Sequence, residues 1–183
     1  MDLNFIKAAD YVLFDVLGGY VDPQGMVWSD GVSQQQYEDW CAKNKSPHQP
    51  DVRSVSWTPT LKQIIAELYW IPNCRLLPPG FDYLFLDAAV CLGVTDAIII
   101  LQRTVGAPST GVIDASTQIQ LGKLRLPLSP DFVSLWIDEY EARFNEVVAT
   151  HPPNEAKLLK FWPNRLQHAR ANALVLLSTI PGA

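Results

Sequence analysis

The sequence FDYLFLDAAVCLGVTDAIIILQRTV, residues 81–105, is a long apolar stretch that decides the fold class. Apolar residues recur on every side of a helix drawn through it, which is typical of a buried helix rather than a surface helix. The stretch therefore predicts one buried helix, or two with a break near Gly93. The breaker Pro78-Pro79-Gly80 stands directly before it and separates it from the preceding elements.

Toward the N-terminus, apolar residues at helical spacing predict a first helix over residues 3–17. Gly18 and Gly19 should end this helix, because two consecutive glycines lose much backbone entropy in a helix and allow the chain to turn. Residues 20–32 combine proline and glycine with alternating valines, and they predict a loop with room for one short hairpin.

Two further helices are expected before the apolar stretch. Ser33 and Gln36 have the spacing of a capping box, so a helix should begin at Ser33 and run to about Ala42. Pro59 fits the first position of another helix, where a missing backbone N–H costs no hydrogen bond. That helix should end before Pro72, because a proline in a helix interior removes a hydrogen bond.

Helical patterns also dominate after the apolar stretch, and the chain as a whole predicts an all-α protein. The C-terminal segments are a loop over 106–113, a short helix over 114–121, a helix starting at 129–130, and a last helix after 152–153 that Pro163 would kink or divide.

Composition narrows the function classes. The chain has 183 residues, 48% of them hydrophobic, which is ample for a core, and its net charge of −5 gives no basic footprint for nucleic acid. Three cysteines at wide spacing and three histidines distant from them predict neither a disulfide framework nor a zinc site. No cofactor and no metal are expected.

The N-terminus lacks the basic start and small-residue cleavage site of a signal peptide, and no apolar run reaches about 18 residues. We therefore expect synthesis in the cytoplasm, no membrane span, and delivery by another agent if the protein works outside the cell.

Four short patterns follow one another along the chain. They are Leu17-Gly18-Gly19-Tyr20 with Gly31-Val32-Ser33; Tyr69-Trp70 with Pro78-Pro79-Gly80; Leu86-Asp87, Gly93, Leu101-Gln102 and Gly111 with Thr117; and Leu158 to Arg165 with Trp162. In this order and spacing they resemble glycoside hydrolase family 108, the phage and bacterial muramidases.

The resemblance covers residues 5 to about 170. It implies a lysozyme-like helical half over 1–80 and, over 81–183, a small accessory helical half similar to the family's predicted peptidoglycan-binding subdomain, the two packed as one globular unit.

The resemblance also shows which catalytic group is missing. The family's essential carboxylate is the glutamate of a Glu-Gly-Gly-Tyr motif, which protonates the glycosidic oxygen, and Leu17 stands at that position here. General acid catalysis contributes roughly 10²- to 10⁴-fold, so leucine at this position predicts loss of turnover. Asp22 and Asp30 in the following loop are the fallback carboxylates, although Asp22 beside Pro23 also fits a turn cap.

Aromatic residues supply the candidate binding surface. Trp28 and Trp57 lie in or beside predicted loops, and Tyr20 and Tyr69 belong to the matched patterns. Three other tryptophans are expected in the core because such side chains usually anchor packing: Trp70, Trp136 and Trp162.

Three functions from different classes remain open at this stage. The favoured one is a catalytically inactive muramidase homologue, reused as a structural or protein-interaction component, for instance of a phage particle or tail. Its partner would be another phage or host protein, and its location the virion or the cell envelope. The second is a peptidoglycan binder without hydrolysis, and the third is a divergent active lysozyme that uses a loop aspartate.

Overall fold

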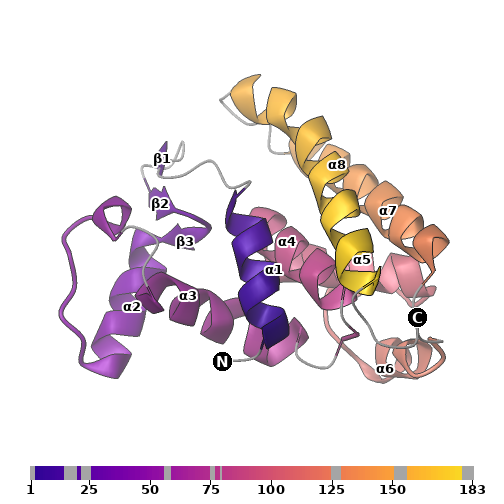
Figure 1. Ribbon diagram of the computed structural model, residues 1–183, viewed down its shortest axis with the longest axis horizontal. Helices are drawn as coiled ribbons and strands as arrows, with labels where there is room; N and C mark the ends of the chain where they lie inside the picture. Colours follow the sequence, from indigo (N-terminus) through magenta and orange to yellow (C-terminus); the bar gives the residue numbers. More distant parts are fainter. Residues whose placement is uncertain are drawn as a thin grey trace.

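The structure is a computed structural model, and it describes residues 3–14, 20–21, 26–55, 59–74, 77–78, 80–124, 129–150 and 156–178. These residues form eight α-helices, two short helices of other types and one small sheet. Figure 1 shows how the helices and the sheet are arranged. The predicted all-α class with a short β element is confirmed.

Helix α4 (Phe81–Leu92) is the central element. Its first nine residues are all buried, as expected for the apolar stretch that encodes it. It packs against α1 (Leu3–Phe14), α5 (Val94–Val105), α7 (Pro130–Thr150) and α8 (Ala156–Ser178). The predicted break is confirmed, because Gly93 has a φ of +92° and separates α4 from α5.

The segment expected as a loop with room for a hairpin is a three-stranded antiparallel sheet within its described residues. The order is β1 (Tyr20–Val21), β2 (Val27–Ser29) and β3 (Val32–Ser33), with Trp28 opposite both Tyr20 and Ser33. The sheet lies with α2 (Gln34–Asn44) at one end of the molecule, and α7 with α8 lie at the other end (Figure 1).

Helix α2 begins as predicted. The Ser33 hydroxyl accepts a hydrogen bond from the Gln36 N–H, and the Gln36 side chain accepts one from the Ser33 N–H, which completes the capping box. In the loop that follows α2, residues Val52–Ser54 form one turn of 3-10 helix, η1.

The prediction that the next helix ends before Pro72 is wrong. Helix α3 (Pro59–Ile65) continues directly into a π-helix, η2 (Ala66–Cys74), which contains Pro72. In an α-helix, a proline ring clashes with the carbonyl of the residue four positions earlier. A π-helix has a wider turn with different hydrogen-bond partners, so it accommodates Pro72. Burial of Tyr69, Trp70 and Cys74 on one side of η2 keeps the segment coiled against the core.

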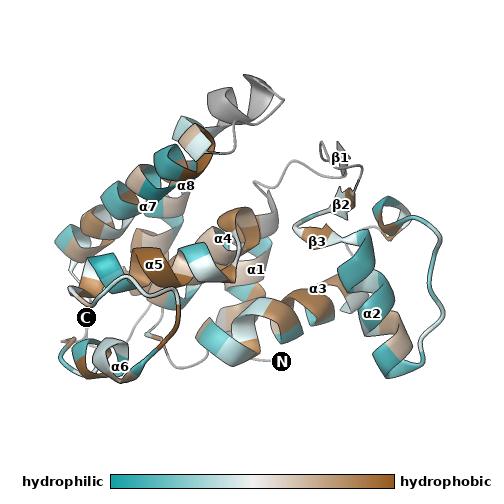
Figure 2. Cartoon of the chain, turned by 180° about the vertical axis from the view of Figure 1, so that it is seen from behind, coloured by the Kyte–Doolittle hydropathy of each residue, from teal (hydrophilic) through white to brown (hydrophobic). Residues whose placement is uncertain are grey.

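The C-terminal part consists of α6 (Ala115–Leu121) and the long antiparallel pair α7 and α8. Pro130 is the first residue of α7, as the sequence predicted, whereas Pro163 lies inside α8 without dividing it. Figure 2 shows hydrophilic residues along the outward sides of α7 and α8 and hydrophobic residues toward α4.

One cluster of buried hydrophobic residues runs from α1 through α4 to α8 and includes the three tryptophans predicted to be core: Trp70, Trp136 and Trp162. Residues of both predicted halves, 1–80 and 81–183, contribute to this cluster. Among the residues that the structure describes, no helix has both the length and the apolarity that a membrane span requires.

Candidate functional site

The β2–β3 turn carries Asp30, one of the fallback carboxylates predicted from the sequence, and it directly follows β2, which contains Trp28, so the candidate site centres on this turn. Asp30 and Gly31 form this two-residue turn, and both have positive φ, +48° and +79°. A two-residue hairpin turn of type I′ requires positive φ at both positions, which aspartate and glycine tolerate best. The local sequence therefore explains the turn.

Gly31 is held in place by two contacts, one with η2 and one with α4. The Tyr69 hydroxyl, in η2, donates a buried hydrogen bond of 3.0 Å to the Gly31 carbonyl. On the other side Gly31 packs so closely on Val90 of α4 that a Cβ at this position would overlap the Val90 Cγ1. The turn is thus fixed against both η2 and α4.

The carboxyl group of Asp30 is half-buried beside this turn. Burial raises the pKa of Asp30 above its ordinary value, and a 3.4 Å hydrogen bond from the Ser29 hydroxyl opposes that shift. A carboxyl with a raised pKa can act as a proton donor. The same residue is also the turn former described above, so its identity has a structural explanation.

Trp28 occupies the middle of β2. Successive side chains of a strand point to opposite faces, and the neighbouring Val27 packs against the buried core. Trp28 therefore lies on the other face of the sheet, where it is partly exposed. An indole in this position offers a flat surface to a sugar ring or to an apolar side chain of a partner.

The remaining predicted site residues are placed as follows. Tyr69 is buried, with its hydroxyl committed to Gly31, and burial raises its pKa. Tyr20 is described only as part of β1, opposite Trp28. Leu17, Asp22 and Trp57 lie outside the described residues. The structure thus brings Trp28, Asp30 and Tyr69 to one end of the fold.

A second polar cluster, which sequence reasoning did not single out, lies inside the helical end. The Asp87 carboxylate of α4 accepts a hydrogen bond from the Arg165 guanidinium of α8 at 2.8 Å and from the Tyr140 hydroxyl of α7 at 3.0 Å. Asp87 is 1% exposed and Arg165 is 7% exposed, so this is a buried ion pair. Burial, followed by the nearby charge of Asp87, raises the pKa of Tyr140 well above its ordinary value.

Trp162 lies three residues before Arg165 and packs beside this cluster. Its ring stacks on Phe144 at a centroid distance of 3.7 Å and meets Tyr140 edge-on at 5.0 Å. Asp87, Trp162 and Arg165 all belong to the patterns that carry the family resemblance. These three residues hold helices together. Their presence in the matched patterns was the sequence signal that could have revealed the Asp87–Tyr140–Arg165 cluster.

The third matched pattern has a similar structural basis. The Gln102 side chain is fully buried, and its amide nitrogen donates to Thr110, Thr117 and the Val112 carbonyl while its oxygen accepts from the Gly111 N–H. The Leu101-Gln102 pair and the Gly111 to Thr117 turn are therefore joined through one side chain.

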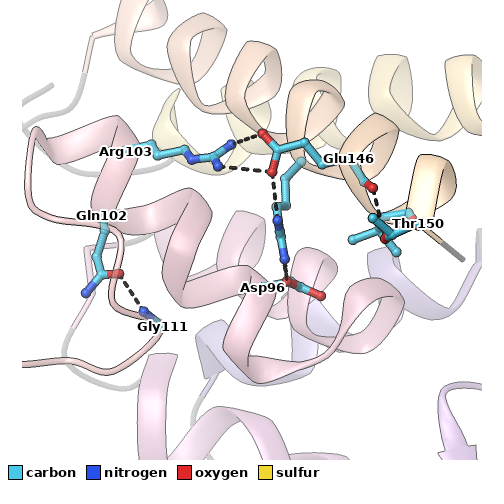
Figure 3. Close-up of polar contacts among 8 residues, drawn as sticks. Asp96, Gln102, Arg103, Gly111, Glu146 and Thr150 are labelled. Atoms are coloured by element: carbon cyan, nitrogen blue, oxygen red, sulfur yellow. Dashed lines mark hydrogen bonds and ion pairs between the residues drawn. The ribbon is translucent and has the colours of Figure 1, made fainter.

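An exposed ion-pair network lies close by, and Figure 3 shows it together with Gln102. Glu146 of α7 accepts hydrogen bonds from Arg103 at 2.8 Å and from Arg143 at 2.7 Å, and Arg143 also pairs with Asp96 of α5. The Arg103 hydrogen bond, followed by that of Arg143, lowers the pKa of Glu146 to about 2. This network joins α5 to α7 at the surface.

The described part of the chain contains no group of three or more histidine, cysteine, aspartate or glutamate side chains that could hold a metal ion. Cys41, Cys74 and Cys91 are free thiols, and Cys41 and Cys74 are buried. The sequence predicted that these cysteines form no disulfide framework.

Comparison with known proteins adds one finding about the fold. No protein-family model and no curated protein matches the sequence. Among solved structures, the chain is similar to SagA of Brucella abortus, with a TM-score of 0.70 and 24% sequence identity over 98% of this chain and 98% of that one. The chain therefore has the fold of SagA over nearly its whole length.

Proposed function

We propose that this protein is a muramidase homologue without lysozyme turnover, reused as a structural or protein-interaction component. A phage particle or tail is the setting that the family resemblance suggests, with another phage or host protein as the partner. The observation that carries the proposal is the state of two positions, that of the family's glutamate and that of the fallback carboxylate Asp30; the other fallback carboxylate, Asp22, lies outside the described residues. Leu17 stands where the family has its glutamate, and Asp30 is used as a turn former with positive φ.

Two further observations support this proposal. The fold extends over 98% of SagA, so the substitution at position 17 is not accompanied by loss of part of that fold. The matched residues Asp87, Gln102 and Arg165 are buried and make contacts that stabilise packing. The chain therefore keeps the residues that hold the fold and lacks the one that would perform general acid catalysis.

A divergent lysozyme is the second candidate, and the raised pKa of Asp30 favours it. Half-burial of this carboxyl moves it toward the protonated form that a general acid needs. Trp28, in the adjacent strand, would give such a site an aromatic surface for a sugar ring. A non-hydrolytic peptidoglycan binder would use the same indole without proton transfer.

The deciding experiment measures soluble fragments released from purified peptidoglycan by the wild type, Leu17→Glu, Asp22→Asn and Asp30→Asn, with sedimentation on the same sacculi. Asparagine at position 30 preserves the turn, because it tolerates positive φ as well as aspartate does. Asp131→Asn, which changes an exposed aspartate of α7, is the matched control for loss of one negative charge.

The proposal predicts neither release nor sedimentation by the wild type. Release by the wild type that disappears in Asp22→Asn or Asp30→Asn and persists in Asp131→Asn would replace the proposal with the divergent lysozyme. Sedimentation without release would replace it with the peptidoglycan binder. Release by Leu17→Glu alone would show that an open cleft survives and that the missing acid is the whole difference from an active enzyme.

A further inference from the structure

The outer helix α8 packs through a regular seam of apolar residues. Five of its buried apolar positions are separated by alternating steps of four and three residues: Trp162, Leu166, Ala169, Ala173 and Leu176. Leu177 and the charged Arg165 are buried beside them. This is the spacing of a coiled-coil seam, in which positions repeat every seven residues. A slip of α8 by one such repeat, roughly 10 Å, would still place apolar side chains in the seam.

The buried ion pair interrupts this repetition at one position. Arg165 sits beside the seam and reaches Asp87 at 2.8 Å, while Tyr140 bonds to the second oxygen of the same carboxylate. One carboxylate therefore joins α4, α7 and α8. A slip of α8 would leave a buried guanidinium and a buried carboxylate without each other, and such a state is strongly unfavourable.

Other contacts agree with this register and are less costly to break. Asn172 of α8 donates a neutral hydrogen bond to the Tyr83 hydroxyl at 3.2 Å. Arg170 donates to the exposed Ser134 hydroxyl at 2.9 Å. Loss of a neutral or an exposed hydrogen bond costs less than separation of a buried pair of charges.

We infer that the Asp87–Tyr140–Arg165 cluster fixes the register of α8 against α4 and α7, and that it serves unique packing more than stability. A buried ion pair replaced by apolar residues of similar size is often neutral or stabilising, because the desolvation of both charges is avoided. A single buried polar group is also a known means of fixing register in packed helices.

The test is a variant with Asp87→Leu, Tyr140→Phe and Arg165→Met, made in the full-length chain. Three measurements apply: helix content by circular dichroism, the urea midpoint, and indole N–H resonances by nitrogen-correlated NMR. We expect unchanged helix content and a midpoint no lower than that of the wild type. The Trp162 indole resonance should split or broaden, because its stacking on Phe144 depends on the register.

Trp70 is the internal control, because it packs on Phe5 of α1 at 5.4 Å and should keep one resonance at its wild-type position. A single sharp Trp162 resonance would overturn the inference wherever it falls, because packing alone would then set one register; Tyr140→Phe alone supplies the reference for the shift caused by the altered neighbouring ring. If the variant fails to fold, a second version carries Asp87→Ala in place of Asp87→Leu, which removes any steric misfit at position 87. Loss of folding in both versions would also overturn the inference.

Discussion

The two ends of this molecule are held by different kinds of contact. At the β2–β3 end, a two-residue turn is fixed by backbone conformation, by one neutral hydrogen bond from Tyr69 and by close packing of Gly31 on Val90. At the helical end, the buried charge pair of Asp87 and Arg165 joins helices that are distant in sequence, and the buried Gln102 of α5 holds the turn that follows its own helix. Steric fit fixes the arrangement at the first end, and buried polar groups fix the arrangement of the packed helices at the second.

The difference separates residues kept for packing from residues available for function. The two buried polar clusters of the helical end, around Asp87 and around Gln102, are bonded internally, so they have little capacity to meet a ligand. Trp28 and Asp30 at the sheet end are partly exposed. A functional surface is therefore expected at the sheet end, and the following variants test the contrast in order of expected effect.

Removing one partner of the buried pair should have the largest effect. Arg165→Met leaves the Asp87 carboxylate buried beside Tyr140 without its cation, which should lower the free energy of unfolding by about 3–5 kcal/mol. Urea denaturation measures this change. Arg170→Met, which removes an exposed guanidinium from the same helix, is the control and should cost less than about 0.5 kcal/mol. Equal losses in both variants would contradict a special role for the buried pair.

The steric anchor of the sheet end should come next. Gly31→Ala adds a Cβ that meets Val90 and forces alanine to positive φ, so we expect a loss of about 2–4 kcal/mol in unfolding free energy. Gly106→Ala is the matched control, because Gly106 also has positive φ, +71°, but its Cβ would point into open space. Its expected loss is about 1–2 kcal/mol.

The two glycine variants together separate backbone strain from crowding, because the excess loss in Gly31→Ala measures the contact with Val90. Adding Val90→Ala to Gly31→Ala should recover part of that excess. If the two glycine variants lose the same stability in urea denaturation, close packing on α4 does not hold the turn.

Loss of the buried glutamine should have an intermediate effect. Gln102→Leu leaves the buried Gly111 N–H without its acceptor and removes the bonds to Thr110 and Thr117, for an expected cost of about 1–3 kcal/mol. The matched control is Gln118→Leu, the same substitution at an exposed position of α6. Thermal unfolding of both variants compares them, and an equal effect would show that the loop is held by packing instead.

The exposed network should matter least and should show a pH dependence. The folded pKa of Glu146 is lowered to about 2 from an ordinary value of 4.5, so its stabilising effect is complete above pH 4.5 and is lost as pH falls toward 2. Because these side chains are partly exposed, Glu146→Gln should cost less than about 1 kcal/mol at pH 7.

The cost of Glu146→Gln should shrink further near pH 2 and in high salt, and urea denaturation at several pH values and salt concentrations measures it. A cost that stays constant between pH 7 and pH 2 would show that the charge of Glu146 contributes nothing to stability.

Local chemistry made much of the fold predictable. The α4–α5 stretch, its break at Gly93 and the capping box of Ser33 and Gln36 depend on neighbouring residues and were confirmed. The sheet was underestimated, because Asp30-Gly31 between two short β-forming runs is itself a strong hairpin signal, whereas the abundance of proline and glycine suggested a loop. The end predicted before Pro72 was wrong because burial of η2 outweighed the local rule.

The sequence by itself determined the helical class and the central buried helix, because each depends on residues close together in the chain. It also showed directly that position 17 carries a leucine and no carboxylate. Only the tertiary structure decided that Tyr69 holds the β2–β3 turn and that Asp87 meets Arg165, a partner 78 residues away. Such pairings arise from helix packing in three dimensions, and local sequence patterns carry no information about which buried charges will face one another.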